Sequence, residues 1–272
     1  MITSIITNII KRQQQKSFCQ LISHRQFKPN RNNNNYYRHC CYHNNNNINK
    51  AYFSSKSEST VVVDEVVAAV NKQKISISNK DIQEFKKMLS NDKNRIITEN
   101  DELLLEKYNT DWTKHYKGVS KVVLKPKTTN EIKNIVSYCY NNNICIVPQG
   151  GNTGLVGGSV AYSSNEIIIN LEKMNNIINF DKDMGILSCE AGCIIQTLQE
   201  YVKQYNYLLP IDLGSKGSCV IGGAISTNAG GQYYYKYGSI HSNLLGLEVV
   251  TAGKEGVKTL NLLNTNLKNN TG

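Results

Sequence analysis

The feature that most constrains this chain is a run of glycines directly after an apolar segment. Five glycines fall within residues 150–158, inside the sequence PQGGNTGLVGGSV, and they follow the apolar residues 144–147. Glycine loses more conformational freedom on folding than any other residue, so this density needs a reason, either positive φ angles or a ligand against bare backbone. The segment therefore predicts a ligand-binding loop.

Two common phosphate-binding loops do not fit this segment. A P-loop needs Gly-x-x-x-x-Gly-Lys-Ser/Thr, and no Lys stands at the required place. A dinucleotide-binding βαβ unit needs Gly-x-Gly-x-x-Gly at the start of a helix and an acid about 20 residues later. Glu172 has a suitable spacing, but the glycines at 151, 154 and 157 do not, and residues 155–165 leave no room for a helix. Both loops are excluded by their context.

The remaining interpretation is a loop whose backbone N–H groups surround a pyrophosphate without help from Lys or metal. Asn152 and Thr153 would add side-chain donors. A second glycine-rich segment, DLGSKGSCVIGGAISTNAGG at 212–231, contains further hydroxyl and amide groups. Two such segments are able to hold one long dinucleotide from both sides. The alternative is that the glycines only form tight turns.

The basic character of the chain is confined to its N-terminus. The formal net charge is +10, but residues 1–57 hold nine Lys and Arg and no Asp or Glu, and the remainder has 22 basic against 21 acidic residues. A nucleic-acid partner is therefore not predicted. The chain also lacks a run of 18 apolar residues, so no membrane span is predicted.

Residues 1–57 have the composition of a mitochondrial transit peptide. They open with MITSIITNIIKR, are rich in Arg, Ser and Gln, and include a suitable cleavage region near residues 53–55. The alternative is a disordered basic arm, which the Asn tracts at 32–35 and 44–47 favour. On the first interpretation these residues are a leader outside the fold, and the protein acts in the mitochondrial matrix.

The eight cysteines predict neither a metal site nor a disulfide framework. Three lie in the leader, and none of the others forms a Cys-x-x-Cys pair. Free Cys in an apolar run behaves as a small hydrophobe, so we predict a packing role. The five that follow the leader are Cys139, Cys145, Cys189, Cys193 and Cys219.

Residues 58–117 predict a helical N-terminal extension, and residues 118–272 a domain of mixed strands and helices. The hydrophobic pattern predicts strands at 122–124, 144–147, 166–171, 176–180, 185–190 and 245–251, and helices at 81–89, 99–108, 128–141 and 194–205. Thr128 and Glu131 form a capping-box signature. Because strands and helices do not alternate strictly, the predicted class is α+β. The single tryptophan, Trp112, is predicted to be a packing anchor rather than a ligand platform.

The two glycine segments, followed by YGSIHSNLLGLEVVTA, carry a resemblance to a known family. Over roughly residues 110–272 the chain resembles the FAD-linked oxidases of the vanillyl-alcohol-oxidase type, and within them the D-2-hydroxyglutarate dehydrogenases. The resemblance implies an α+β, PCMH-type FAD-binding domain of two subdomains, followed in the family by a substrate-binding cap. The sequence stops at Gly272, so we expect the FAD domain to be incomplete at its C-terminus and the cap to be absent.

The resemblance also implies how FAD is held. The first loop would wrap the pyrophosphate and the second would line the flavin. Asn152 stands near the place where several relatives carry a flavin-linked histidine, so FAD would be bound non-covalently. His241 is predicted to be structural rather than a flavin contact. The implied cofactor-binding residues are Pro148, Gln149, Gly150, Gly151, Asn152, Thr153, Gly154, Gly157, Gly158, Ser159, Gly217, Ser218, Cys219, Gly222, Gly223, Thr227, Asn228 and Gly230.

The activity that the resemblance implies is FAD-dependent oxidation of D-2-hydroxyglutarate to 2-oxoglutarate, with electrons passed to an electron-transfer flavoprotein. D-lactate or another D-2-hydroxy acid is the alternative substrate, and a truncated, non-catalytic FAD-binding fragment is the alternative function. A carboxylate clamp is usually Arg, but Arg95 is the only Arg after the leader and precedes the flavin motifs. The resemblance places the substrate arginine, the catalytic histidine and a divalent metal in the cap. No catalytic or metal-binding residue is therefore predicted in this chain, and a homodimer remains open.

Overall fold

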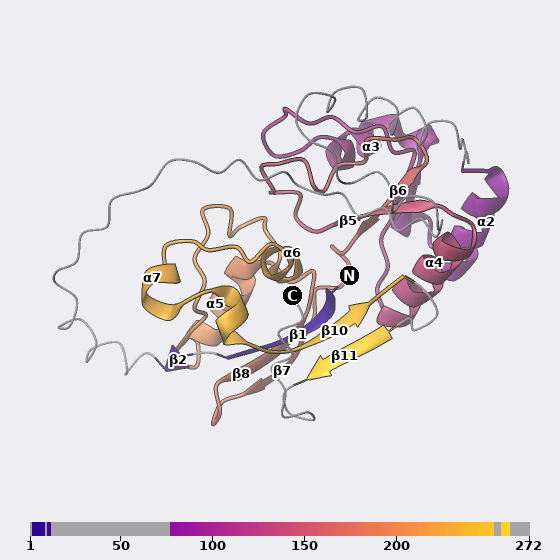
Figure 1. Cartoon of the computed structure of the whole chain (residues 1–272). Coiled ribbons are helices and arrows are strands. Elements are labelled where there is room, and N and C mark those ends of the chain that lie inside the picture. Colours follow the sequence, from indigo (N-terminus) through magenta and orange to yellow (C-terminus); the bar gives the residue numbers. More distant parts are fainter. Residues whose placement is uncertain (1, 9, 12–76, 253–256, 262–272) are drawn as a thin grey trace, which may run out of the picture. The chain divides into compact units, whose positions relative to one another are not determined.

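The structure is a computed structural model that describes residues 2–8, 10–11, 77–252 and 257–261 (Figure 1). The strands of these residues form a four-stranded sheet, a five-stranded sheet and a two-stranded ribbon. The first sheet contains parallel pairs and the second is antiparallel throughout. This arrangement confirms the predicted mixture of strands and helices without a doubly wound sheet.

The first sheet is built around a buried central strand. In spatial order its strands are β3 (Ile96–Thr98), β4 (Val122–Leu124), β6 (Glu166–Asn170) and β5 (Cys145–Gln149). β4 and β5 pair with β6 in parallel, and β3 pairs antiparallel with β4. Residues 167–169 of β6 are fully buried, as expected of a strand covered on both faces. The C-terminal ends of β5 and β6 therefore lie side by side, which places the first glycine loop at that edge.

The helix α4 (Thr129–Asn141) connects β4 to β5 and buries the apolar face that its sequence predicted. Its start forms only half of the predicted capping box. Thr128 Oγ1 accepts from the Glu131 N–H at 3.2 Å, but the Glu131 carboxylate accepts from the Lys127 N–H at 2.7 Å instead of from the N-cap. The carboxylate is turned away because it also binds the buried Arg95.

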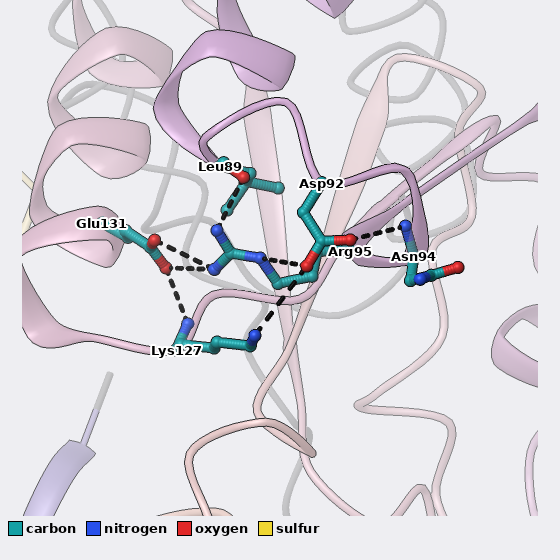
Figure 2. Close-up of polar contacts among 6 residues, drawn as sticks. All are labelled: Leu89, Asp92, Asn94, Arg95, Lys127 and Glu131. Atoms are coloured by element: carbon teal, nitrogen blue, oxygen red, sulfur yellow. Dashed lines mark hydrogen bonds and ion pairs between the residues drawn. The ribbon is translucent and has the colours of Figure 1, made fainter.

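Arg95 is the centre of a polar network that joins three elements (Figure 2). Its Nη1 donates to both carboxylate oxygens of Glu131 at 2.9 and 2.7 Å, and its Nη2 donates to the Leu89 carbonyl at 2.6 Å. Its Nε lies 3.3 Å from Asp92 Oδ2, an ion-pair contact rather than a well-directed hydrogen bond. With only 4% of its surface exposed, Arg95 links α2 (Asn79–Met88), η3 (Lys93–Arg95) and α4. Its guanidinium is therefore committed to the fold.

The second sheet is antiparallel and has five strands. In spatial order they are β11 (Val257–Asn261), β10 (Leu244–Val250), β1 (Ile2–Asn8), β8 (Ile186–Glu190) and β7 (Ile177–Asp181). β1 pairs with both β8 and β10, and β2 (Ile10–Lys11) pairs with β9 (Tyr207–Leu208). The interpretation of residues 1–57 as a leader outside the fold did not include β1 and β2. The rest of the proposed leader, residues 1, 9 and 12–57, lies outside the described residues.

The helices complete the packing around these sheets. They are α3 (Glu102–Asn109), preceded by η4 (Glu99–Asp101), α5 (Ile195–Lys203), α6 (Ile221–Ser226), α7 (Tyr234–Tyr237) and η5 (Ile240–Asn243). One buried apolar cluster contains residues of α2, α4, α5 and α6 together with strands of both main sheets. Residues 150–165 contain no helix, as the sequence predicted. None of the helices in the described part of the chain is long and apolar enough to cross a bilayer.

Candidate cofactor-binding site

A cavity of about 1060 Å³ lies at the C-terminal ends of β5 and β6. Such an edge, outside the carboxyl ends of parallel strands, is where α/β sheets commonly bind their ligands. Its volume suits a large organic ligand. The residues that line it fall within five segments, 107–114, 149–152, 170–177, 192–198 and 217–220. The cavity therefore brings part of each glycine-rich segment to one place.

The two glycine segments pack directly against each other. A Cβ on Gly150 would lie 2.4 Å from Val220 Cγ2, and a Cβ on Gly151 would lie 2.0 Å from the Ser218 carbonyl oxygen. Neither distance is compatible with a side chain, so these two positions require glycine for the packing of the loops. Gly222 is a glycine for the same reason, because its Cβ would lie 2.6 Å from that of Ala191.

Other predicted glycines have no such reason among the residues that the structure describes. In that part of the chain nothing lies within 4 Å of a Cβ built on Gly154 or Gly158, and the nearest atom to one built on Gly223 or Gly230 is 3.8 Å away. None of these four has a left-handed φ. A ligand in contact with bare backbone is one physical reason for glycine at such positions.

The first loop is held by the side chain of Gln149, which is 2% exposed. Its Nε2 donates to the carbonyl oxygens of Tyr108 at 2.8 Å and Ser159 at 2.9 Å, and its Oε1 accepts from Asn170 Nδ2 at 3.0 Å. All of its polar atoms are thus engaged within the protein. Gln149 shapes the loop and does not offer its side chain to a ligand.

Asn152 has a similar structural role. Its φ is +52°, in the left-handed region that Asn tolerates better than most residues. Its Nδ2 donates to the Thr110 carbonyl at 2.7 Å, and its Oδ1 accepts from Ser159 Oγ at 2.7 Å. We expected Asn152 to add a side-chain donor for a phosphate, whereas the structure uses that amide to fix the turn.

The backbone donors of the first loop are free. The N–H groups of residues 150–157 make no hydrogen bond to any residue that the structure describes. In the second segment, by contrast, the N–H groups of Ser218 and Cys219 both donate to the Ser215 carbonyl at 2.8 Å. Successive free N–H groups next to a left-handed residue form an anion-binding concavity. The first loop is therefore suited to hold a phosphate or pyrophosphate.

The remaining predicted cofactor-binding residues fall into two groups, those that line the cavity and those that do not. Gly217 and Ser218 line the cavity. Cys219 is buried, and Pro148, Thr227 and Asn228 are exposed. The other predicted residues do not line the cavity. They are Pro148, Thr153, Gly154, Gly157, Gly158 and Ser159 in the first segment, and Cys219, Gly222, Gly223, Thr227, Asn228 and Gly230 in the second.

The sequence reasoning missed the wall of the cavity formed by residues 107–114. Trp112 lines the cavity and is 58% exposed, so its prediction as a packing anchor was wrong. The physical reason is its context, since DWTKHYKG contains no neighbouring aliphatic residues that would carry the indole into a core. A large aromatic in a polar segment was the signal that pointed to a binding role.

A charged cluster forms another part of the wall. Glu172 accepts from Tyr108 Oη at 3.2 Å and pairs with Lys125 Nζ at 3.2 Å. Burial, and then the charge of Glu172, raises the pKa of Tyr108. Burial alone would lower the pKa of Lys125, but its contacts with Tyr108 and Glu172 raise it. Glu172 was excluded above as the acid of a βαβ site, and the structure nevertheless places it in the same cavity as the glycine loop.

The other candidate residues have structural environments. His241 Nε2 lies 2.6 Å from the Ile225 carbonyl, a contact typical of a structural histidine. Cys139, Cys189, Cys193 and Cys219 are buried free thiols, in agreement with the predicted packing role. Among the residues that the structure describes, no group of three or more His, Cys, Asp or Glu is placed to hold a metal ion.

Comparisons with known proteins agree with this geometry. The chain is 48% identical over 197 residues to the mitochondrial D-2-hydroxyglutarate dehydrogenase of Arabidopsis thaliana, covering 72% of this chain and 34% of that protein. It is 40% identical over 199 residues to a putative mitochondrial D-lactate dehydrogenase of Schizosaccharomyces pombe, covering 72% and 37%. The chain thus spans about a third of the length of these relatives.

A solved structure shows the same fold. An alkyldihydroxyacetonephosphate synthase superposes with a TM-score of 0.55 at 18% identity, covering 65% of this chain and 38% of the synthase. In sequence, residues 120–260 match the profile of the FAD binding domain family, which is just over half of the chain. With its free glycine loop and the cavity beside it, the chain therefore belongs to the family of FAD-binding domains.

Proposed function

We propose that this chain is the FAD-binding part of a D-2-hydroxyglutarate dehydrogenase, which oxidises D-2-hydroxyglutarate to 2-oxoglutarate. The observation that supports FAD binding is the run of free N–H groups at residues 150–157, beside a cavity of about 1060 Å³. The substrate follows from the similarity to relatives named D-2-hydroxyglutarate dehydrogenase. Because one relative is named a D-lactate dehydrogenase, D-lactate is the second candidate substrate.

The residues fit a non-covalently bound FAD. Backbone N–H groups of Gly150–Gly154 would hold the pyrophosphate, and Gly217 and Ser218, which line the same cavity, would lie beside it. Gly154 and Gly158, with open space over their backbones, would allow close approach of the cofactor. When bound, FAD supplies the hydride acceptor for oxidation of the hydroxy acid.

The described residues of this chain do not supply a substrate clamp. Arg95 is the only Arg after residue 57, and its guanidinium is bound to Glu131, Asp92 and Leu89. We propose that recognition of the substrate carboxylates, the catalytic histidine and a divalent metal belong to a cap domain. An electron-transfer flavoprotein would accept the electrons.

Titration of the purified chain with FAD, followed by anaerobic addition of D-2-hydroxyglutarate, tests both parts of the proposal. A retained flavin absorbance band supports FAD binding, and its bleaching supports catalysis by this chain. D-lactate and L-2-hydroxyglutarate serve as comparison substrates. Failure to retain flavin would contradict the FAD proposal, whereas bound flavin that no substrate bleaches would favour the non-catalytic alternative.

We also propose that the chain acts in the mitochondrial matrix. The support is the acid-free, basic composition of residues 1–57 and the mitochondrial names of its relatives. Import into isolated mitochondria, followed by N-terminal sequencing of the imported protein, tests this localisation. A protein that is imported but keeps Met1 would contradict the cleavage near residues 53–55.

A further inference from the structure

Trp112 is the only tryptophan of the chain, and its indole lies uncovered in the wall of the cavity. Its exposed fraction is 58%, and it lines the same cavity as Gly150, Gly151 and Asn152. No aromatic ring or cation of the described residues stacks on it. A tryptophan that contributed to the core would bury most of its large apolar surface. The exposed indole thus lies in the same cavity as the first glycine loop (residues 150–157, called the anion-binding loop below), and no ring or cation of the described residues stacks on it.

The turn that carries Trp112 is held by several hydrogen bonds. Asp111 is 3% exposed, and its carboxylate accepts from the N–H groups of Thr113 at 3.1 Å and Tyr116 at 2.9 Å. The Asp111 N–H donates to the Tyr116 carbonyl at 3.1 Å, and the Lys114 N–H donates to the Asp111 carbonyl at 3.1 Å. Trp112 is therefore displayed from a fixed backbone, so little entropy would be lost when a ligand packs against it.

The same turn is tied to the anion-binding loop. Thr110, two residues before Trp112, accepts from Asn152 Nδ2 at 2.7 Å. Lys107 and Lys114, on either side of Trp112 in sequence, also line the cavity. The wall thus combines an aromatic surface and positive charge next to free backbone N–H groups. This combination matches a ligand that carries a planar ring system close to phosphate groups.

We infer that Trp112 is a stacking platform for one of the two ring systems of the dinucleotide bound in this cavity. The inference rests on the proposed FAD binding and adds a binding residue outside both glycine segments. Stacking of a base on an aromatic side chain is worth about 1–3 kcal/mol by alanine substitution. Replacing Trp112 by Ala should therefore raise the Kd for FAD by about fivefold to 150-fold.

The affinity test compares four forms of the full chain in equilibrium titrations with FAD, followed by flavin absorbance and anisotropy. Trp112→Ala should bind more weakly by the stated factor, and Trp112→Phe should recover most of the affinity because it keeps an aromatic face. Tyr235→Ala is the matched control, since Tyr235 is 97% exposed and does not line the cavity. Unchanged thermal unfolding of the variants shows that they fold.

Fluorescence of the single tryptophan identifies the ring that stacks. FAD alone is not diagnostic, because its flavin quenches tryptophan by energy transfer over a distance. ADP has no flavin, so a change of Trp112 emission on ADP binding assigns the adenine. If ADP binds without such a change, and FMN affinity falls in Trp112→Ala but not in Trp112→Phe, the isoalloxazine is the stacked ring.

The possible failures are distinguishable. If the wild-type chain and Trp112→Ala bind FAD equally well, the platform inference is refuted while FAD binding stands. If the wild-type chain binds none of FAD, ADP and FMN, both the proposed cofactor site and the stacking inference are refuted. An equal loss of affinity in Tyr235→Ala would attribute the effect to general damage and would also overturn the inference.

Discussion

The first loop requires glycine at Gly151 for packing within the protein, whereas we propose that it requires glycine at Gly154 for contact with the cofactor. Substitution of each by Ala distinguishes the two requirements. Gly151→Ala would place a Cβ 2.0 Å from the Ser218 carbonyl, whereas Gly154→Ala enters open space. We expect the first variant to lose stability and FAD affinity together. The second should unfold at the wild-type temperature and lose only FAD affinity, because its Cβ meets the cofactor rather than the protein.

Thermal unfolding without cofactor and FAD titration of both variants give the two readouts. Gly154→Ala with unchanged FAD affinity would show that no ligand approaches that backbone. A stable Gly151→Ala would show that the two glycine segments are further apart than the structure places them.

At the scale of elements, the Arg95 network joins α2, η3 and α4 (Figure 2). Arg95→Met would leave the partly buried Glu131 carboxylate without its partner, and Glu131 still reaches water with 17% of its side chain. We therefore expect a loss of about 3 kcal/mol in the free energy of unfolding, at the low end for a broken buried pair. Urea unfolding measures this loss.

Two variants control for this experiment. The double variant Arg95→Met with Glu131→Met should recover part of the loss, because no unpaired charge remains. Lys121→Met removes an exposed pair with Glu99 and should cost less than about 1 kcal/mol. Equal losses in Arg95→Met and Lys121→Met would contradict the structural role assigned to Arg95.

The contact between α2 and α4 predicts a dependence of stability on alkaline pH. Tyr138 Oη donates to Asp81 Oδ1 at 2.7 Å, and this bond, followed by burial, raises the pKa of Tyr138 from 10.0 to about 12. Between these values only the unfolded chain loses the Tyr138 proton. The stabilisation present below pH 10 is therefore lost as the pH rises to about 12. Because Tyr138 is only half-buried, we expect the loss to be about 1 kcal/mol.

The measurement is the difference in unfolding free energy between the wild-type chain and Tyr138→Phe on both sides of this pH range. Taking the difference cancels the titration of the other tyrosines. Tyr140→Phe is the control, since Tyr140 is 42% exposed. Parallel pH profiles for the wild-type chain and Tyr138→Phe would exclude a stabilising role for this hydrogen bond.

Most elements of residues 118–251 were predicted within two residues of their ends, because hydrophobic periodicity and turn residues are local signals. Several elements were missed, and for two of them, β3 and α6, the reason is nonlocal. β3 has three residues and exists through its pairing with β4. α6 contains Gly222 and Gly223, which disfavour a helix, yet Gly222 allows the helix to pack closely against Ala191.

At the scale of the whole molecule, β1 decides whether the second sheet is continuous. It pairs with β8 on one side and β10 on the other, so its removal leaves both of those strands with unpaired edges. A chain that begins after residue 11 should unfold at a lower temperature and self-associate. Thermal unfolding and sedimentation of this chain, with Ile5→Pro in the full chain as a point variant that removes one ladder N–H, test this.

The result also bears on the proposed leader. A shortened chain that is as stable and as monomeric as the full chain would show that β1 contributes nothing to the sheet, which would favour a leader that is removed on import. A destabilised chain would mean that a mature protein lacking these residues needs another strand between β8 and β10.

The sequence by itself predicted a ligand-binding role for the first glycine loop, and it determined the order of strands and helices around the loop and the absence of a helix after it. These depend on glycine spacing and hydrophobic periodicity, which are local properties of the chain. Only the tertiary structure decided that Gly150 and Gly151 are needed for packing against the second segment, that the Gln149 and Asn152 side chains shape the loop, and that Trp112 faces the cavity. Each of these depends on contacts between segments far apart in sequence, and local patterns carry no record of such contacts.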